Sequence, residues 1–427
     1  MKVAFCTLGC KVNQYESQSM EQALIKRGFE CVEASEEADV YIVNSCTVTA
    51  ESDRKTRQNV RHLRKLHPDA VIVLTGCMPQ AFPEDARLLT QADIVTGNRS
   101  NKQIPDMIDE FFRTRERIVR IAQHENGEKF SGELINDFRE RTRATVKIED
   151  GCNRFCSYCV IPYARGRVRS KPLEDIREEI SSLEKKGFSE IVLVGINLSA
   201  YGTDCGASIC DAVELAASFD GIKRVRLGSL EPDHMTPEVT KRLAECKKLC
   251  PQFHISLQSG CDKTLKRMNR HYTAAEYEEL CTRLRSKFED TTLTTDVMVG
   301  FSGETKEDFE ISRDFVRKIG FEKVHVFPYS RRAGTRAAEF PDVVENAEKE
   351  RRSREMIAAA GEVRHEFLER QIGRTVEVLF EEKLRDGSIQ GYTANYTPVR
   401  IKSGCTRGLR KVKITACGDD WCEGELI

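Results

Sequence analysis

Hydrophobic and polar positions alternate along the first part of the chain in a pattern that predicts a parallel sheet with crossover helices. Short runs rich in β-branched residues predict strands, and the amphipathic stretches between them predict helices. The predicted strands are Val3–Leu8, Val40–Asn44, Val71–Thr75 and Ile94–Val95, separated by predicted helices at Tyr15–Arg27, Ser52–Leu66 and after Met78. This order favours an α/β fold whose first domain, residues 1–118, is a flavodoxin-like parallel sheet.

A second, longer alternation follows a polar stretch at residues 123–143. Its predicted strands are Thr145–Ile148, Ile191–Val194, Arg224–Leu227, Phe253–Leu257, Leu293–Val297 and Val324–Phe327. Six strand–helix repeats predict a complete or partial parallel barrel, and the family resemblance given below favours a central (β/α)6 partial TIM barrel. We assign it to residues 138–368, together with a linker helix at its C-terminal end. That helix belongs to the long charged stretch of residues 344–371.

The pattern changes again after Gly373, where short β segments replace the helices. These segments are residues 375–380, 391–396, 398–403 and 409–416. They predict a small antiparallel β-barrel, which we assign to residues 369–427.

Composition narrows the class of protein without identifying it. The 427 residues carry 67 Lys and Arg against 68 Asp and Glu, so the formal net charge is −1 and no global basic field indicates a nucleic-acid partner. Charged residues make up 32% and hydrophobic residues 40%, as in globular proteins. No apolar run approaches the roughly 18–20 residues of a membrane span, and the first residues do not resemble a secretory signal. We expect a cytoplasmic protein with no membrane partner.

The 17 cysteines are the feature that this composition does not explain. A long chain with an odd number of thiols and no signal favours a reducing compartment. There, cysteines are more often metal ligands, catalytic groups or small packing residues than disulfides. Most of them should be packing residues, so the argument depends on the few whose spacing indicates chemistry.

The strongest local motif is the CxxxCxxC triplet Cys152, Cys156 and Cys159, which follows the first predicted barrel strand. Three thiolates this close together suit one iron–sulfur cluster and leave its fourth iron without a protein ligand. Zinc and coincidence are the alternatives. Zinc sites usually close with four ligands, and no fourth ligand lies nearby in the sequence.

Three further cysteines, Cys10, Cys46 and Cys77, are far apart in sequence, but each lies about two residues beyond a predicted strand. The carboxyl ends of parallel strands meet at one edge of a sheet, so these thiols are expected to converge there. Gly9 and Gly76 precede two of them and permit tight turns. The alternative is three buried cysteines that pack at strand ends.

The CxxxCxxC loop on a six-stranded partial barrel resembles the radical S-adenosylmethionine (SAM) enzymes. The resemblance implies that the open iron binds SAM and that reduction cleaves SAM to a 5′-deoxyadenosyl radical. It also implies SAM contacts at the other strand ends. These are Gly195 and Asn197 for the methionyl part, Ser229 and Glu231 for the ribose or amine, Gln258 for SAM or substrate, and Asp296 beside the adenine.

The segments around the three distant cysteines, residues 7–17, 44–49 and 75–80, resemble those of the methylthiotransferases, and the resemblance covers essentially the whole chain. It implies that Cys10, Cys46 and Cys77 hold an auxiliary [4Fe-4S] cluster with an open iron, and that the C-terminal module is a TRAM RNA-binding domain. The implied cofactors are therefore two [4Fe-4S] clusters and SAM. No catalytic residue beyond the cluster ligands is implied.

Within this family, the stretch Lys11-Val12-Asn13-Gln14-Tyr15-Glu16-Ser17 and the triplet interior Asn153–Phe155 resemble the branch that methylthiolates C2 of N6-threonylcarbamoyladenosine at position 37 of tRNA. One SAM would methylate a sulfur on the auxiliary cluster and a second would supply the radical. The implied partners are a tRNA anticodon stem-loop and an electron donor such as flavodoxin or ferredoxin, with the sulfur source unknown. The alternatives are isopentenyladenosine in tRNA, a ribosomal protein aspartate, or a non-enzymatic iron–sulfur protein that binds RNA or senses redox state.

Local basic stretches support an RNA partner, although the net charge of the whole chain is close to zero. Residues 399–413 hold six Lys and Arg and no acids, residues 143–171 hold seven against two, and residues 51–67 hold six against two. Such stretches track phosphates, although a solvated surface is the plain alternative. Tyr163 and Tyr329 are candidates to stack on a flipped base. The other eleven cysteines are expected to be packing or surface thiols.

Overall fold

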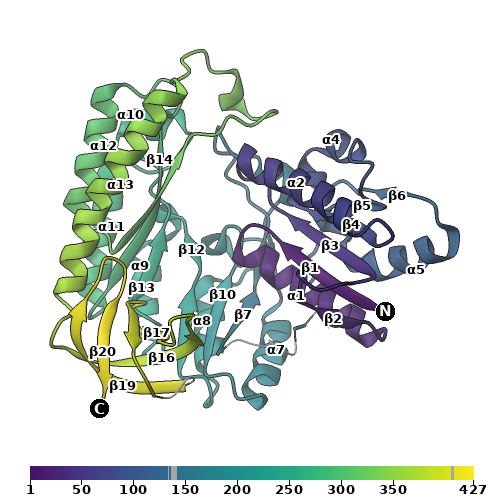
Figure 1. Ribbon diagram of the computed structural model, residues 1–427. Helices are drawn as coiled ribbons and strands as arrows, with labels where there is room; N and C mark the ends of the chain where they lie inside the picture. The colour runs from purple at the N-terminus through teal and green to yellow at the C-terminus, as the bar shows by residue number, and fades with distance from the viewer. Residues whose placement is uncertain (133, 136–141, 405–407) are drawn as a thin grey trace.

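The computed structural model describes the whole chain except residues 133, 136–141 and 405–407. Figure 1 shows three parts: an N-terminal α/β layer, a central arc of strands covered by helices, and a small β-barrel beneath that arc. The α/β fold class, with its parallel sheet, partial barrel and C-terminal β-barrel, is confirmed.

The N-terminal part is one parallel sheet of six strands with the order β2-β1-β3-β4-β5-β6. This order contains the 2-1-3-4-5 arrangement of flavodoxin-like sheets. The strands are β1 (Lys2–Thr7), β2 (Glu30–Val32), β3 (Val40–Ser45), β4 (Val71–Gly76), β5 (Ile94–Thr96) and β6 (Ile118–Arg120). The helices are α1 (Lys11–Lys26), α2 (Ala50–Leu66), α3 (Cys77–Ala81), α4 (Pro83–Arg87), the 3₁₀ helix η1 (Asn98–Gln103) and α5 (Ile104–Thr114).

The six barrel strands form an open arc in two hydrogen-bonded sheets, β11-β10-β7 and β12-β13-β14-β15. All strand pairs within these two sheets are parallel, and β11 and β12 are one strand position interrupted at Gly228. The strands are β7 (Arg143–Lys147), β10 (Glu190–Val194), β11 (Arg224–Leu227), β12 (Ser229–Leu230), β13 (Gln252–Ile255), β14 (Thr292–Val299) and β15 (Lys323–Pro328).

Helices cover the outside of the arc and short elements connect the strands. They are α6 (Ile161–Arg165), α7 (Leu173–Lys185), η2 (Leu198–Ala200), α8 (Ile209–Ala217), η3 (Pro232–His234), α9 (Pro237–Ala244), α10 (Asp262–Arg267), α11 (Ala274–Lys287), α12 (Lys306–Ile319) and η4 (Arg336–Glu339). A short antiparallel pair, β8 (Glu149–Asp150) and β9 (Arg169–Ser170), brackets the loop with the cysteine triplet. Helix α13 (Asn346–Glu369) then leads to the last part.

The C-terminal part is a closed five-stranded barrel with the order β16-β17-β18-β20-β19. Its strands are β16 (Thr375–Lys383), β17 (Ile389–Thr393), β18 (Pro398–Ile401), β19 (Gly408–Cys417) and β20 (Cys422–Leu426). This barrel packs under the amino ends of the arc, where the Thr292 hydroxyl donates to the carbonyl of Asn395 at 2.5 Å.

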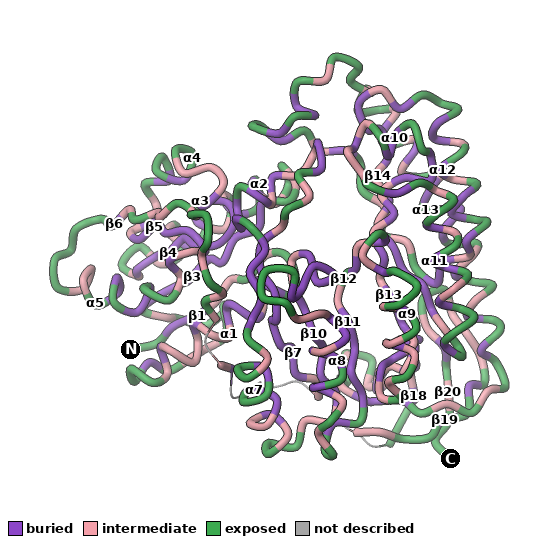
Figure 2. The backbone as a smooth tube through the Cα atoms, turned by 180° about the vertical axis from the view of Figure 1, so that it is seen from behind, coloured by how far each residue is buried: buried purple, intermediate pink, exposed green. Residues whose placement is uncertain are grey.

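The N-terminal sheet and the arc share buried contacts along α1. Val12, in the first turn of α1, packs with Val192 and Val194 of β10. Tyr15 belongs to the arc's own hydrophobic core, and its hydroxyl donates to the carboxylate of Glu179 at 3.0 Å. Figure 2 shows buried backbone running through both parts. Among the described residues, no helix has the length and apolarity needed to cross a membrane.

Candidate functional site

Cys10, Cys46 and Cys77 converge at the carboxyl edge of the N-terminal sheet. They follow β1, β3 and β4, so the first two flank the point where the strand order reverses, which is where ligands bind in open parallel sheets. Gly9 has φ +104°, and a Cβ there would lie 2.8 Å from the Cβ of Cys46. Cys10 is exposed, whereas Cys46 and Cys77 are buried.

Asn13 ties the three turns together. Its side-chain amide donates to the carbonyl of Leu8, before Cys10, at 2.8 Å and to that of Ser45, before Cys46, at 2.9 Å. The thiols of Cys10 and Cys77 lie 3.7 and 4.0 Å from its side-chain oxygen. One buried amide therefore fixes the relative positions of all three cysteines.

The second triplet lies in the loop between β8 and α6, at the carboxyl ends of the barrel strands. Gly151 has φ +88°, and a Cβ there would lie 2.0 Å from the carbonyl oxygen of Arg167, so glycine is required at this turn. The amide of Cys152 donates to the carbonyl of Gly166 at 3.0 Å, and that of Cys159 to Cys156 at 3.0 Å. These bonds fold the loop so that its three thiols lie near one another.

Two of the residues expected to contact SAM lie directly beside this loop. The side-chain amide of Asn197 lies 3.8 Å from the sulfur of Cys152, and its oxygen is buried without a hydrogen-bond partner among the described residues. A Cβ on Gly195 would lie 2.5 Å from a carboxylate oxygen of Glu149. The orphaned oxygen fits a donor from a bound cofactor, because buried acceptors are rarely left unpaired.

The remaining expected contacts are spread around the same barrel opening. Glu231 pairs with Arg270 at 2.5 Å, and Arg270 also donates to the sulfur of Cys156 at 3.3 Å. Gln258 follows β13 with φ +65°, and its backbone N–H donates to the carbonyl of Asp296 at 2.8 Å. The carboxylate of Asp296 lies 3.4 Å from His254, and Ser229 is exposed.

A cavity of about 860 Å³ connects the N-terminal cysteine edge with the barrel interior. Cys10 and Lys11 line it from the N-terminal part, and Gly195, Ser229 and Asp296 line it from the strands. The C-terminal barrel closes one side with Gln390, Tyr392, Tyr396, Pro398, Arg400, Asp420 and Trp421. All three parts of the chain therefore contribute to the lining of one cavity, which is partly open to solvent.

A buried arginine accompanies each cysteine triplet. Arg165 donates to the sulfur of Cys77 at 3.2 Å, as Arg270 does to that of Cys156, and the two side chains are 1% and 3% exposed. Burial raises the pKa of Cys77 to about 12, and Arg165 opposes that rise. Thiolates that ligated a cluster here would carry negative charge into this interior, and the guanidinium would compensate for it.

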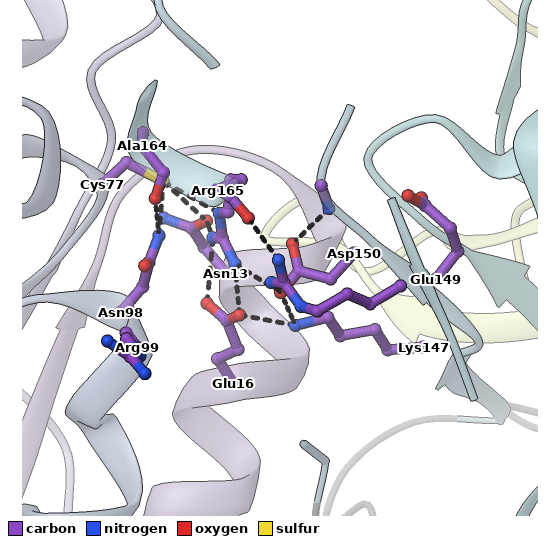
Figure 3. Close-up of polar contacts among 12 residues, drawn as sticks. Asn13, Glu16, Cys77, Asn98, Arg99, Lys147, Glu149, Asp150, Ala164 and Arg165 are labelled. Carbon is purple, nitrogen blue, oxygen red and sulfur yellow. Dashed lines mark hydrogen bonds and ion pairs between the residues drawn. The ribbon is translucent and has the colours of Figure 1, made fainter. Parts of the chain in front are cut away.

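Arg165 belongs to a network that joins the two parts of the molecule (Figure 3). Its guanidinium donates to Asn13 at 2.7 Å and pairs with both carboxylate oxygens of Glu16. Lys147 pairs with Glu16 at 2.8 Å and with Asp150 at 2.7 Å. Helix α6, which carries Arg165, packs against α3, which begins at Cys77. The network therefore sets the position of one cysteine triplet relative to the other.

The spacing of both triplets fits a multi-iron cluster better than one zinc ion. Zinc holds thiolates at about 2.3 Å, which brings its ligand sulfurs within about 4 Å of one another. Within the part of the chain that the structure describes, one set of three His, Cys, Asp or Glu ligand atoms lies mutually within 4.8 Å, and it is His254, Asp296 and His325. In each cysteine triplet, at least one pair of sulfurs therefore lies more than 4.8 Å apart, which is wider than the spacing that one zinc ion imposes.

The basic stretch of residues 143–171 is not the solvated RNA surface that its charge count indicated. Lys147, Arg165, Arg169 and Lys171 are buried. Lys171, like the first three, pairs with a carboxylate, that of Glu179. Of the seven Lys and Arg residues in this stretch, only Arg167 is exposed, and it lies beside the ring of Phe155. The other basic residues of this stretch hold the domains and the cysteine loop in place.

The two candidate stacking residues differ. Tyr163 is 52% exposed next to the cysteine loop, whereas Tyr329 is 5% exposed and packs against Phe301, so the stacking role proposed for Tyr329 was wrong.

Of the cysteines expected to be packing or surface thiols, five are buried: Cys210, Cys250, Cys261, Cys281 and Cys422. Cys405 lies outside the described residues.

Comparison with known proteins places the chain in a family. Residues 2–97 match the family described as uncharacterized protein family UPF0004, and residues 146–316 match the radical SAM superfamily. The threonylcarbamoyladenosine tRNA methylthiotransferase MtaB of Bacillus subtilis is 35% identical over 100% of this chain and 96% of its own length. That of Thermotoga maritima is 37% identical over 98% of each chain. A tRNA-2-methylthio-N(6)-dimethylallyladenosine synthase of Clostridium novyi is 33% identical over 99% and 95%.

Solved structures share the fold. The radical SAM methyltransferase TsrM of Kitasatospora setae, solved with cobalamin and a [4Fe-4S] cluster, superposes with a TM-score of 0.57 at 15% identity, over 77% of this chain and 74% of that one. The cobalamin-dependent radical SAM enzyme OxsB gives 0.51 at 13% identity, over 82% and 56%. At such identities the likeness concerns the fold alone.

A CxxxCxxC loop at the carboxyl ends of a partial parallel barrel defines the class of radical SAM enzymes, and the matched superfamily agrees. The full-length relatives take the assignment further. The chain belongs to the tRNA methylthiotransferase family, whose members use SAM and two [4Fe-4S] clusters.

Replacing Arg165 tests whether the buried network positions the auxiliary cysteines. Arg165→Met leaves Cys77 without its cation and Glu16 with fewer partners, which costs about 3–5 kcal/mol for a broken buried pair. We expect a lower unfolding temperature and a loss of iron from the N-terminal site, measured by thermal unfolding and iron analysis. Arg167→Met, two residues along and exposed, is the control and should change neither. Normal iron content and stability in Arg165→Met would show that the network does not hold the site.

Glu149 gives a prediction of pH dependence. It is fully buried and accepts the backbone N–H of Asn197 at 2.7 Å. Burial, and then the charge of Asp150, raise the pKa of Glu149 well above its usual value. The folded chain therefore holds a proton that the unfolded chain releases above its ordinary pKa, so stability falls as pH rises from about 4.5 towards the folded pKa.

Glu149→Gln removes this proton uptake. We expect the variant to gain stability relative to the wild type as pH rises from 5.5 to 8.5, with a limiting slope of about 1.4 kcal/mol per pH unit. Thermal unfolding across this range measures the difference. Glu174→Gln, on a side chain 83% exposed, is the control and should give a constant difference. A constant difference for Glu149→Gln as well would contradict a raised pKa.

Proposed function

We propose that this chain methylthiolates C2 of N6-threonylcarbamoyladenosine at position 37 of tRNA. The observation that carries the proposal is the shared cavity, which Cys10 of one triplet lines together with Gly195, Ser229 and Asp296 of the barrel. A reaction that needs two cofactor sites on one substrate atom requires such a common space. The full-length similarity to enzymes named for this substrate supports the choice of base.

The cofactors supply the chemistry that side chains cannot: when bound, SAM and the barrel cluster provide radical chemistry at an unactivated C–H bond, and the auxiliary cluster provides the sulfur. The chain's residues bind and position them. We propose Cys152, Cys156 and Cys159 as ligands of the first cluster and Cys10, Cys46 and Cys77 as ligands of the second. Gly195, Asn197, Ser229, Glu231, Gln258 and Asp296 are the proposed SAM contacts.

The polypeptide also prepares the sites electrostatically. Arg165 and Arg270 each place a positively charged guanidinium next to one sulfur of a cysteine triplet. Because both guanidiniums are buried and held by carboxylates, they need no reorganisation when a cluster is present. Such fixed charges favour the thiolate form that metal binding requires.

The basic residues that are exposed, rather than paired with carboxylates inside the protein, offer a surface for the proposed tRNA partner. Helix α2 exposes Arg54, Lys55, Arg61 and Lys65, and Arg400 of the C-terminal barrel lies 3.6 Å over the ring of Trp421. Cationic and aromatic side chains of this kind bind single-stranded loops. We further propose a cytoplasmic location and a small electron donor such as flavodoxin or ferredoxin.

Nucleoside analysis of tRNA from a deletion strain tests the function. We expect loss of the methylthio derivative of threonylcarbamoyladenosine and no other change, with restoration by the wild-type gene. Loss of the methylthio derivative of isopentenyladenosine instead would move the chain to the other tRNA branch. An unchanged profile would contradict a tRNA substrate and leave the ribosomal-protein and non-enzymatic alternatives.

The ligand assignment has a separate test. The wild-type holoenzyme should hold about eight irons per chain, and the triple variant Cys10→Ala/Cys46→Ala/Cys77→Ala about four. The variant should still cleave SAM reductively but transfer no methylthio group, because its barrel triplet is intact. Cys205→Ala, at an exposed cysteine outside both triplets, is the control and should keep all the iron. A triple variant that retained eight irons would refute the auxiliary site.

A further inference from the structure

Lys11 lines the shared cavity next to Cys10, and its ammonium group makes no hydrogen bond or ion pair with any residue that the structure describes. It is the first residue of α1, and its side chain is exposed in a cavity that is partly open to solvent. An ammonium group that lines a cavity without a bonded carboxylate can bind an anionic group of a ligand that enters there.

The surroundings of Lys11 strengthen this preference for an anion. The guanidiniums of Arg143 and Arg226 lie near enough to act electrostatically on Lys11, as do Tyr396 and the carboxylate of Glu190. These two arginines have carboxylate partners: Arg143 pairs with Glu381 at 2.6 Å and Arg226 with Glu190 at 3.0 Å. Lys11 is thus the member of this cationic cluster that remains available to a ligand.

The other cations of the cavity are less suitable. Arg364 pairs with Glu322 and with Asp420, and Arg400 stacks over Trp421. The ammonium group of Lys323 also makes no hydrogen bond or ion pair with a described residue, but it stands on β15, and the groups that act electrostatically on Lys11 do not include it. Lys11 is therefore the unpaired cation beside a cysteine of the auxiliary site.

The chemistry of the substrate supplies the matching anion. A threonyl group joined through a carbamoyl to N6 of adenine keeps a free carboxylate, whereas an isopentenyl group has none. The N6 substituent and C2 both lie on the Watson–Crick edge of the base. A side chain that binds the substituent must therefore stand close to the place where C2 meets the auxiliary site.

We propose that Lys11 binds the carboxylate of the threonylcarbamoyl group and so selects this modified adenosine over one with an apolar N6 substituent. This inference rests on the proposed function and adds the residue that recognises the substrate. The contact is a charge-assisted hydrogen bond in a space walled by protein, which corresponds to a change in affinity of about 10- to 100-fold.

Equilibrium binding to the holoenzyme without reductant, so that no turnover occurs, tests the contact. The probes are an anticodon stem-loop with threonylcarbamoyladenosine and the same stem-loop with its carboxylate methylated to a neutral ester. We expect the wild type to prefer the acid about 10- to 100-fold, Lys11→Gln to lose that preference and Lys11→Arg to keep most of it. Lys323→Gln, which removes a charge from the same cavity, is the matched control and should keep the preference. Iron content should be unchanged in all three variants.

Each contrary result has a distinct meaning. Equal affinity of the wild type for acid and ester overturns the proposal without any variant. A preference kept by Lys11→Gln, or lost in Lys323→Gln instead, also overturns it, while methylthiolation of the acid stem-loop by the wild type upholds the proposed function. A wild type that does not methylthiolate the acid stem-loop overturns the function and this inference together.

Discussion

The buried guanidinium of Arg165 is the constraint on which the two-site arrangement depends. A charge in a protein interior must be paired, and its partners Glu16, Asn13 and Cys77 all come from the N-terminal part, whereas Arg165 itself follows the barrel's cysteine loop. Lys147 and Asp150 extend the same network from the barrel strands. Displacing one domain against the other would leave several buried charges unpaired at once. The separation of the two cysteine triplets is therefore fixed by electrostatics as well as by packing.

The sequence was sufficient for the features that depend on periodicity and strand ends. All six barrel strands and four of the six N-terminal strands lie where alternation predicts them, and the convergence of Cys10, Cys46 and Cys77 follows from their positions after parallel strands. Strands β2, β6 and β20 were not predicted. Most of their residues are exposed or only half-buried, so they lack the continuous apolar run by which the equally short but fully buried β5 was predicted.

The sequence was insufficient where a side chain's partner is distant. Arg165 and Glu16 are 149 residues apart, so counting charges near Arg165 shows a basic stretch and conceals the ion pair. The same holds for Arg332, whose guanidinium donates to Asp53 at 2.5 Å across 279 residues and anchors α2 after the Cys46 turn. Asn13 was likewise part of a matching motif, but its role as the amide that joins three turns required the tertiary structure. A short stretch of sequence contains only one of the two residues that form each such interaction.

The shared cavity explains why one chain carries three structural parts. The N-terminal sheet contributes a cysteine edge, the arc contributes the strand ends, and the C-terminal barrel closes the amino-terminal side of the lumen. That closure is itself cationic and aromatic, because Arg226 lies 4.6 Å over Tyr396, which stacks on Tyr392. None of the three parts encloses the space alone. A substrate atom that must meet two cofactor sites in succession is therefore positioned by contacts between domains, and a change in any one domain alters the geometry experienced by the other two.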